Sequence, residues 1–126
     1  METKRRLLVA EDDLEVRTLL KRVLTREGFE VETAANGKDA MGLLQAGRPY
    51  DAVISDIRMP EKDGEQLLRE SRQLRPDLKV VLITSYGELE QCNRLLREGA
   101  FDYLTKPFKI PDLLDILDRA LPASTA

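Results

Sequence analysis

Some residue types are absent or scarce in this chain, and each absence removes a class of function. The 126 residues include no histidine and a single cysteine, Cys92. An internal disulfide is therefore excluded, and so are a zinc site of the usual kind and a Ser-His or Cys-His catalytic pair. Any metal that the chain binds must be held by oxygen atoms.

Long hydrophobic runs and a surplus of positive charge are also missing. The longest apolar runs, such as residues 80–83, are far shorter than the roughly 20 residues that span a bilayer, and the N-terminus has no signal-peptide core. We therefore expect a cytoplasmic protein with no membrane partner. The net charge of −3 and the pI near 5.1 argue against direct nucleic-acid binding, because phosphate contacts need a basic face.

Short apolar segments alternate with segments of helical periodicity along the whole chain, which predicts an α/β fold. The expected strands are residues 7–10, 30–34, 52–55, 79–84 and 102–105. Five strand-helix units predict a five-stranded parallel sheet with helices on both faces, in a single domain. Residues 30–34 alternate like an edge strand, so we expect the flavodoxin-like order 2-1-3-4-5. The core would cover residues 7–121, and residues 122–126 would be a tail or the start of a linker.

Helical spacing also assigns apolar residues to inner helix faces. Leu74 falls on the inner side of the third helix, and Leu89 and Cys92 lie on that of the fourth, where Cys92 is a small core residue. Ile116 lies off the inner stripe of the last helix, as a residue in contact with a partner would. That inner stripe comprises Ile110, Leu113, Leu114, Leu117 and Leu121.

Acidic residues follow the first and third strands, which this strand order makes neighbours. Glu11, Asp12 and Asp56 would converge in one crevice, where three carboxylates repel one another unless a cation is present. An oxygen-seeking divalent ion, Mg²⁺ or Mn²⁺, suits such ligands. Thr84 and Lys106 follow the fourth and fifth strands and add a hydroxyl group and a positive charge. This combination is typical of phosphoryl transfer, with Asp56 as the nucleophile.

Taken singly, each of these residues has a simpler explanation. Asp13 and its acidic neighbours fit a helix N-terminus in which Asp13 is the cap. Asp56 could form a turn, and Lys106 could be a surface charge. The functional interpretation is preferred because four separate loops at one sheet edge each supply a residue type that the same chemistry requires.

The sequence resembles the receiver domain of bacterial response regulators, the chemotaxis-regulator-like switch of two-component signalling, from about residue 7 to residue 121. The motifs that carry the resemblance are Glu11-Asp12, Asp56-Ile57-Arg58-Met59-Pro60 with Asp63-Gly64, Thr84-Ser85 and Lys106-Pro107-Phe108. The resemblance implies that Asp56 accepts a phosphoryl group from a sensor histidine kinase or a phosphotransfer protein. It implies a switch rather than an enzyme in the usual sense, although the domain assists its own phosphorylation and dephosphorylation.

The resemblance also assigns roles to the individual residues around Asp56. Asp12, Asp56 and the backbone carbonyl of Arg58 would bind Mg²⁺ directly, and Glu11, which replaces the more usual aspartate, would act mainly through water. Thr84 and Lys106 would contact the phosphoryl group, and Tyr103 would turn inward when Thr84 moves. The peptide bond between Lys106 and Pro107 would be cis.

The resemblance implies that three residues beside the site tune the access of hydrolytic water: Arg58, Ser85 and Tyr86. Because Arg58 and Tyr86 are large, we expect slow loss of the phosphoryl group. The face formed by the fourth helix, fifth strand and fifth helix would contact an output partner or an effector domain, and a phosphorylation-linked dimer is a further expectation.

Three other functions can be set against this interpretation. A flavin-binding electron carrier shares the topology, but it needs a phosphate-binding loop where this chain has acids. A resemblance to magnesium-dependent aspartyl phosphatases would require a second acid two residues after the nucleophile, where this chain has Arg58. The third alternative is a pseudo-receiver, a protein-binding module of the same fold that never carries phosphate.

Overall fold

Strands and helices alternate along the chain in this computed structural model, which describes residues 4–85 and 88–121. The strands are β1 (Arg6–Ala10), β2 (Glu30–Ala34), β3 (Ala52–Asp56), β4 (Lys79–Thr84) and β5 (Asp102–Thr105). The helices are α1 (Leu14–Arg26), α2 (Gly37–Gln45), α3 (Gly64–Leu74), α4 (Leu89–Arg97) and α5 (Ile110–Ala120). Among the described residues, no helix has the length and apolar character needed to cross a membrane.

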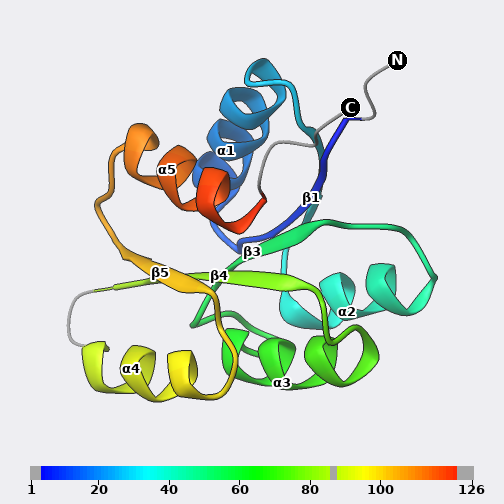
Figure 1. Cartoon of the computed structure of the whole chain (residues 1–126), viewed down its shortest axis with the longest axis vertical. Coiled ribbons are helices and arrows are strands. Elements are labelled where there is room, and N and C mark those ends of the chain that lie inside the picture. Colours follow the sequence, from blue (N-terminus) through cyan, green and yellow to red (C-terminus); the bar gives the residue numbers. More distant parts are fainter. Residues whose placement is uncertain (1–3, 86–87, 122–126) are drawn as a thin grey trace.

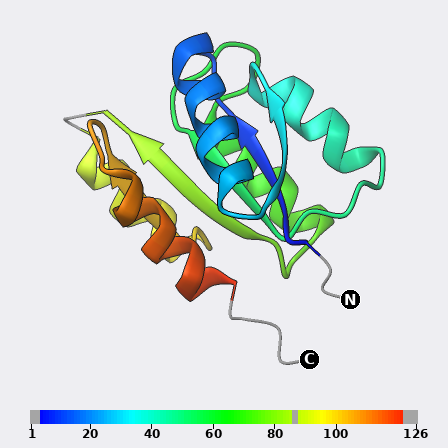
Figure 2. The ribbon, with the colours of Figure 1, turned by 90° about the horizontal axis from the view of Figure 1, so that it is seen from above.

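The five strands form one parallel sheet in the order β2-β1-β3-β4-β5, which confirms the predicted fold. Helices α1 and α5 cover one face of the sheet, and α2, α3 and α4 cover the other (Figure 1). Figure 2 looks onto the face that α1 and α5 cover. Ala10 at the end of β1 lies in register with Ser55 in β3, so the loops after these strands begin side by side.

Side chains of the central strands alternate between two hydrophobic clusters, one on each face of the sheet. Leu8 and Val53 point into the cluster under α2, α3 and α4, whereas Leu7 and Ile54 point into the cluster under α1 and α5. All four are completely buried. Each such side chain contributes about 1.5–3 kcal/mol through removal from water, which is why this part of the sheet is a rigid support for the loops at its edge.

Short polar side chains begin three of the helices. Asp13 accepts hydrogen bonds from the backbone N–H groups of Glu15 and Val16, which confirms it as the cap of α1. Asn36 caps α2 in the same way, and Asp63 caps α3. Helix α4 differs, because its N-cap residue, Glu88, makes no side-chain capping hydrogen bond.

Three apolar residues lie differently from the helical-stripe prediction. Ile116 is only 4% exposed and packs with Leu113 in the cluster under α5, so its assignment to a contact surface is wrong. It lies three positions after Leu113 and therefore shares its helix face. Leu74 and Leu89 are 47% and 53% exposed; Leu74 is the last residue of α3 and Leu89 the first of α4. Cys92 is buried, as predicted.

Candidate functional site

Asp56 is the last residue of β3, and its backbone is held on both sides. The hydroxyl of Ser55 donates a hydrogen bond of 2.8 Å to the backbone oxygen of Asp56, and the N–H of Ile57 donates one of 2.9 Å to Ile83 O in β4. Gly64 packs so closely on the Asp56 carbonyl that a Cβ atom there would overlap it. The Asp56 carboxylate therefore leaves the sheet edge from a fixed backbone.

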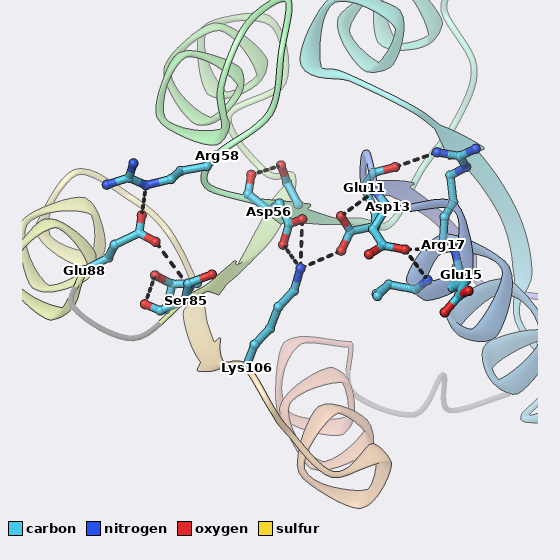
Figure 3. A network of polar contacts seen from close by, with 12 residues as sticks. Glu11, Asp13, Glu15, Arg17, Asp56, Arg58, Ser85, Glu88 and Lys106 are labelled. Atoms are coloured by element: carbon cyan, nitrogen blue, oxygen red, sulfur yellow. Dashed lines mark hydrogen bonds and ion pairs between the residues drawn. The ribbon is translucent and has the colours of Figure 1, made fainter.

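Two acids from the loop after β1 lie beside Asp56. One carboxylate oxygen from each of Glu11, Asp12 and Asp56 lies within 4.8 Å of the others. Glu11 is buried, and its Oε2 accepts a hydrogen bond of 3.1 Å from the backbone N–H of Asp13. The guanidinium of Arg17 donates to the backbone oxygen of Glu11 at 2.8 Å (Figure 3). The predicted convergence of the three acids is therefore present in the structure.

Lys106 brings one positive charge to these acids from the loop after β5. Its Nζ lies 2.9 Å from Oε1 of Glu11 and 3.1 Å from Oδ2 of Asp56 (Figure 3). The backbone N–H of Lys106 donates to Thr84 O at 2.7 Å, which aligns the loops after β4 and β5. The peptide bond between Lys106 and Pro107 is cis.

The balance of charge in this cluster is negative, because three carboxylates face one ammonium group. Burial, together with the neighbouring carboxylate of Glu11, raises the pKa of Asp56 to about 8, and Lys106 offsets only part of this effect. Burial opposes ionisation of Glu11 as well, but Asp56, the Asp13 amide and Lys106 together lower its pKa. A divalent cation fits these residues, since all their donor atoms are oxygens and two negative charges lack a counter-ion.

Thr84 and Tyr103, the two residues predicted to move together, differ in what they contact. Thr84 is buried at the end of β4, and its hydroxyl donates to Ser85 O at 3.1 Å. Tyr103, in β5, is partly buried and packs on the cluster under α4. Tyr86, expected to tune access to the site, lies outside the described residues.

A cavity of about 230 Å³ opens over these groups at the carboxyl end of the sheet. It is lined by Asp12, Asp13, Asp56, Arg58, Ile83, Ser85, Glu88 and Lys106. Sequence reasoning missed Glu88 because it reads as an ordinary first-turn acid of α4. It also missed Arg17, whose bond to the Glu11 backbone joins residues six apart. The signal that was available for Glu88 is its place four residues after Thr84, in the loop that ends at the cavity.

Residues 7–118 match the family model of the response regulator receiver domain. The chain belongs to this family. Receiver domains are the phosphorylation-dependent switches of two-component regulators, so the resemblance drawn from the sequence motifs is confirmed.

Among curated proteins, this receiver domain is 42% identical over 116 residues to the regulatory protein AtoC of Escherichia coli, covering 92% of this chain and 25% of that protein. It is 32% identical to sporulation initiation phosphotransferase F of Bacillus subtilis, covering 93% of this chain and 94% of that protein. The chain thus spans about a quarter of the first relative and nearly all of the second.

Among solved structures, the receiver domain superposes on the response regulator TrrA of Thermotoga maritima with a TM-score of 0.83 and 34% identity. The match covers 93% of this chain and 99% of that one. TrrA was solved in complex with Mg²⁺ and a beryllium fluoride group.

Proposed function

We propose that this receiver domain accepts a phosphoryl group on Asp56 from a phosphohistidine of a sensor histidine kinase or phosphotransfer protein, in the presence of Mg²⁺ or Mn²⁺. The observation that carries the proposal is the position of Asp56, at the end of a buried strand and within reach of both Lys106 and the acids Glu11 and Asp12. A surface carboxylate with no role would not need a partly buried lysine and two further acids around it.

In the transfer step, an oxygen of Asp56 attacks phosphorus while the P–N bond of the phosphohistidine breaks and leaves its electron pair on the imidazole nitrogen. Lys106 faces the oxygens that carry the transferred charge, which an ammonium group stabilises. Asp12, Asp56 and the Arg58 carbonyl would hold the cation, with Glu11 acting through water. The bound cation supplies charge neutralisation and keeps Asp56 ionised at neutral pH.

After transfer, Thr84 turns its hydroxyl from Ser85 O to the phosphoryl group, and Tyr103 follows inward. The change is read at the face formed by α4, β5 and α5, by an output partner, an attached effector domain or a second copy of this domain. Arg58, Ser85 and Tyr86 restrict hydrolytic water, so the phosphoryl group is lost slowly. A half-life of seconds would contradict this last point.

Incubation with Mg²⁺ and acetyl phosphate, followed by intact-mass measurement, tests the assignment of Asp56. We expect one added phosphoryl group on the wild type and none on Asp56→Ala. Asp118→Ala is the matched control, because Asp118 is an exposed acid on α5, remote in sequence from the site. A wild type that gains no mass would instead favour the pseudo-receiver, and equal labelling of Asp56→Ala would refute the assignment of the phosphoacceptor.

A further inference from the structure

Glu88 is a nearly buried acid whose carboxylate is incompletely satisfied. Its side chain is 7% exposed at the N-cap position of α4, yet it caps no amide of that helix. Oε1 accepts a hydrogen bond of 3.2 Å from the backbone N–H of Ser85. Oε2 lies 3.2 Å from Nε of Arg58, but it has no hydrogen-bond partner of acceptable geometry among the described residues. A buried carboxylate with an unsatisfied oxygen loses little free energy when it changes its hydrogen-bond partners.

Arg58 makes the contact from the opposite side of the cavity. Its side chain is 82% exposed and reaches from the loop after β3 to the start of α4. Figure 3 shows the Arg58–Glu88 pair on one side of Asp56 and Glu11 on the other. Arg58, Ser85 and Glu88 all line the cavity that contains Asp56. The two donors that Glu88 holds are therefore donors that face the place of an incoming phosphoryl group.

We propose that Glu88 is an internal competitor of the phosphoryl group on Asp56. In the unphosphorylated domain, its carboxylate holds the guanidinium of Arg58 and the N–H of Ser85. On phosphorylation, both donors turn to the phosphoryl oxygens and release Glu88. This inference rests on the proposed function of Asp56 and adds a route from that residue to α4.

The charges decide the direction of this exchange. A phosphoryl group carries a charge of about −1.5 to −2 near pH 7, against −1 for a carboxylate, so it is the stronger acceptor for Arg58. The released carboxylate of Glu88 stays beside the uncapped N-terminal amides of α4, where a negative charge is favourable. Glu88 thus loses the Arg58 guanidinium and the Ser85 N–H as partners and gains backbone N–H groups at the start of α4. The start of α4 would change its capping as a direct result of phosphorylation.

The affinity of the Mg²⁺-loaded protein for beryllofluoride, a phosphoryl mimic, measures this competition by calorimetric titration. Glu88→Gln keeps an acceptor for the Ser85 N–H but removes the charge, so Arg58 no longer has to leave a partner. Because the Arg58 side chain is solvent-exposed, screening limits the strength of its ion pair with Glu88, and we expect Glu88→Gln to bind roughly threefold to fivefold more tightly than wild type. Glu90→Gln is the matched control, because it removes the same charge from an exposed residue of the same helix turn.

A double-mutant cycle with Arg58→Gln separates competition from a merely structural effect. Without Arg58, the Glu88→Gln substitution relieves only charge repulsion, so its gain in affinity should shrink to less than about twofold. Arg58→Gln itself should weaken binding more in the Glu88→Gln background than in wild type. Thermal melting of the four proteins would show that all are folded under the titration conditions.

Two results would overturn the proposal. Glu88→Gln could bind beryllofluoride no more tightly than Glu90→Gln, or its gain could be the same with and without Arg58. In both cases the wild type would still bind beryllofluoride. Failure of the proposed function looks different, because wild type would then neither bind beryllofluoride nor gain phosphoryl mass from acetyl phosphate, and the competitor role would fall with it.

Discussion

Replacing Asp56 by asparagine should stabilise the fold, because burial and the neighbouring Glu11 carboxylate make an ionised Asp56 unfavourable in the folded protein. Its pKa rises from 3.8 to about 8 in the folded protein. A folded-state pKa above the unfolded value means that the group's stabilising contribution is present below about pH 4 and lost as the pH rises towards 8. At pH 7, the solution pH lies about three units above the unfolded pKa. The stability that Asp56 costs the folded protein therefore has an upper limit of about 4 kcal/mol.

Rearrangement of Glu11 and Lys106 around a charged Asp56 lowers this limit. We expect Asp56→Asn to raise the free energy of unfolding by about 2–4 kcal/mol at pH 7 in the absence of divalent cations. Asparagine keeps the size of the side chain and an oxygen that faces Lys106, so the change isolates the charge.

Urea unfolding followed by circular dichroism, with EDTA present, measures the effect. The difference between variant and wild type should be large at pH 7 and close to zero at pH 3, where the carboxyl group of the unfolded chain is also largely protonated. Added Mg²⁺ should narrow the difference at pH 7, because the cation stabilises only the protein that binds it. A variant that is no more stable than wild type at pH 7, or a difference that does not change with pH, would refute the reasoning. The exposed Asp118→Asn serves as the control.

Two further predictions concern the packing behind Asp56 and the polar contacts between α3 and α4. Gly64→Ala places a Cβ atom against the Asp56 carbonyl, so we expect a loss of about 1–3 kcal/mol in urea unfolding and slower labelling by acetyl phosphate. Gly42→Ala in α2, where a Cβ meets nothing within 4 Å, should instead stabilise the fold by about 0.5–1 kcal/mol; equal effects of the two would contradict the packing argument. The second prediction concerns Glu65, whose pKa is lowered by hydrogen bonds from Arg94 and Gln91. Its contribution is present above pH 4.5 and lost as the pH falls through its folded pKa, so wild type should lose stability in acid more steeply than Glu65→Gln. Parallel urea midpoints of the two proteins from pH 6 to pH 3 would count against this assignment.

Much of the fold follows from local patterns. The strands β3 and β4 are apolar on both sides, so they must lie where helices cover both faces of the sheet. The alternation of apolar and polar residues in β2 instead indicates an edge position. Once the strand order was inferred from these patterns, Glu11, Asp12 and Asp56 had to meet, because neighbouring parallel strands end at the same edge.

The remaining features depend on tertiary contacts that no local pattern records. Ile116 and Leu114 are two residues apart on α5, and only the rotation of that helix against the sheet decides that Ile116 is buried and Leu114 partly exposed. The pairing of Glu88 with Arg58 joins two loops 30 residues apart. Glu61 and Lys62 have positive φ angles of 61° and 109°, which nothing in their identity predicts, because these side chains rarely adopt such a backbone.

Strand β5 differs from the strands at the centre of the sheet in a way that bears on signalling. It has a neighbour on one side only, β4, and all four of its residues remain partly exposed. Few contacts are lost when such an edge shifts, so its local opening costs less free energy than that of β1, β3 or β4. The domain therefore combines a rigid central sheet, which keeps Asp56 in place, with an edge strand that opens more easily and is separated from β3 by β4 alone. A conformational change that begins at Asp56 would therefore reach the protein surface most easily through β5.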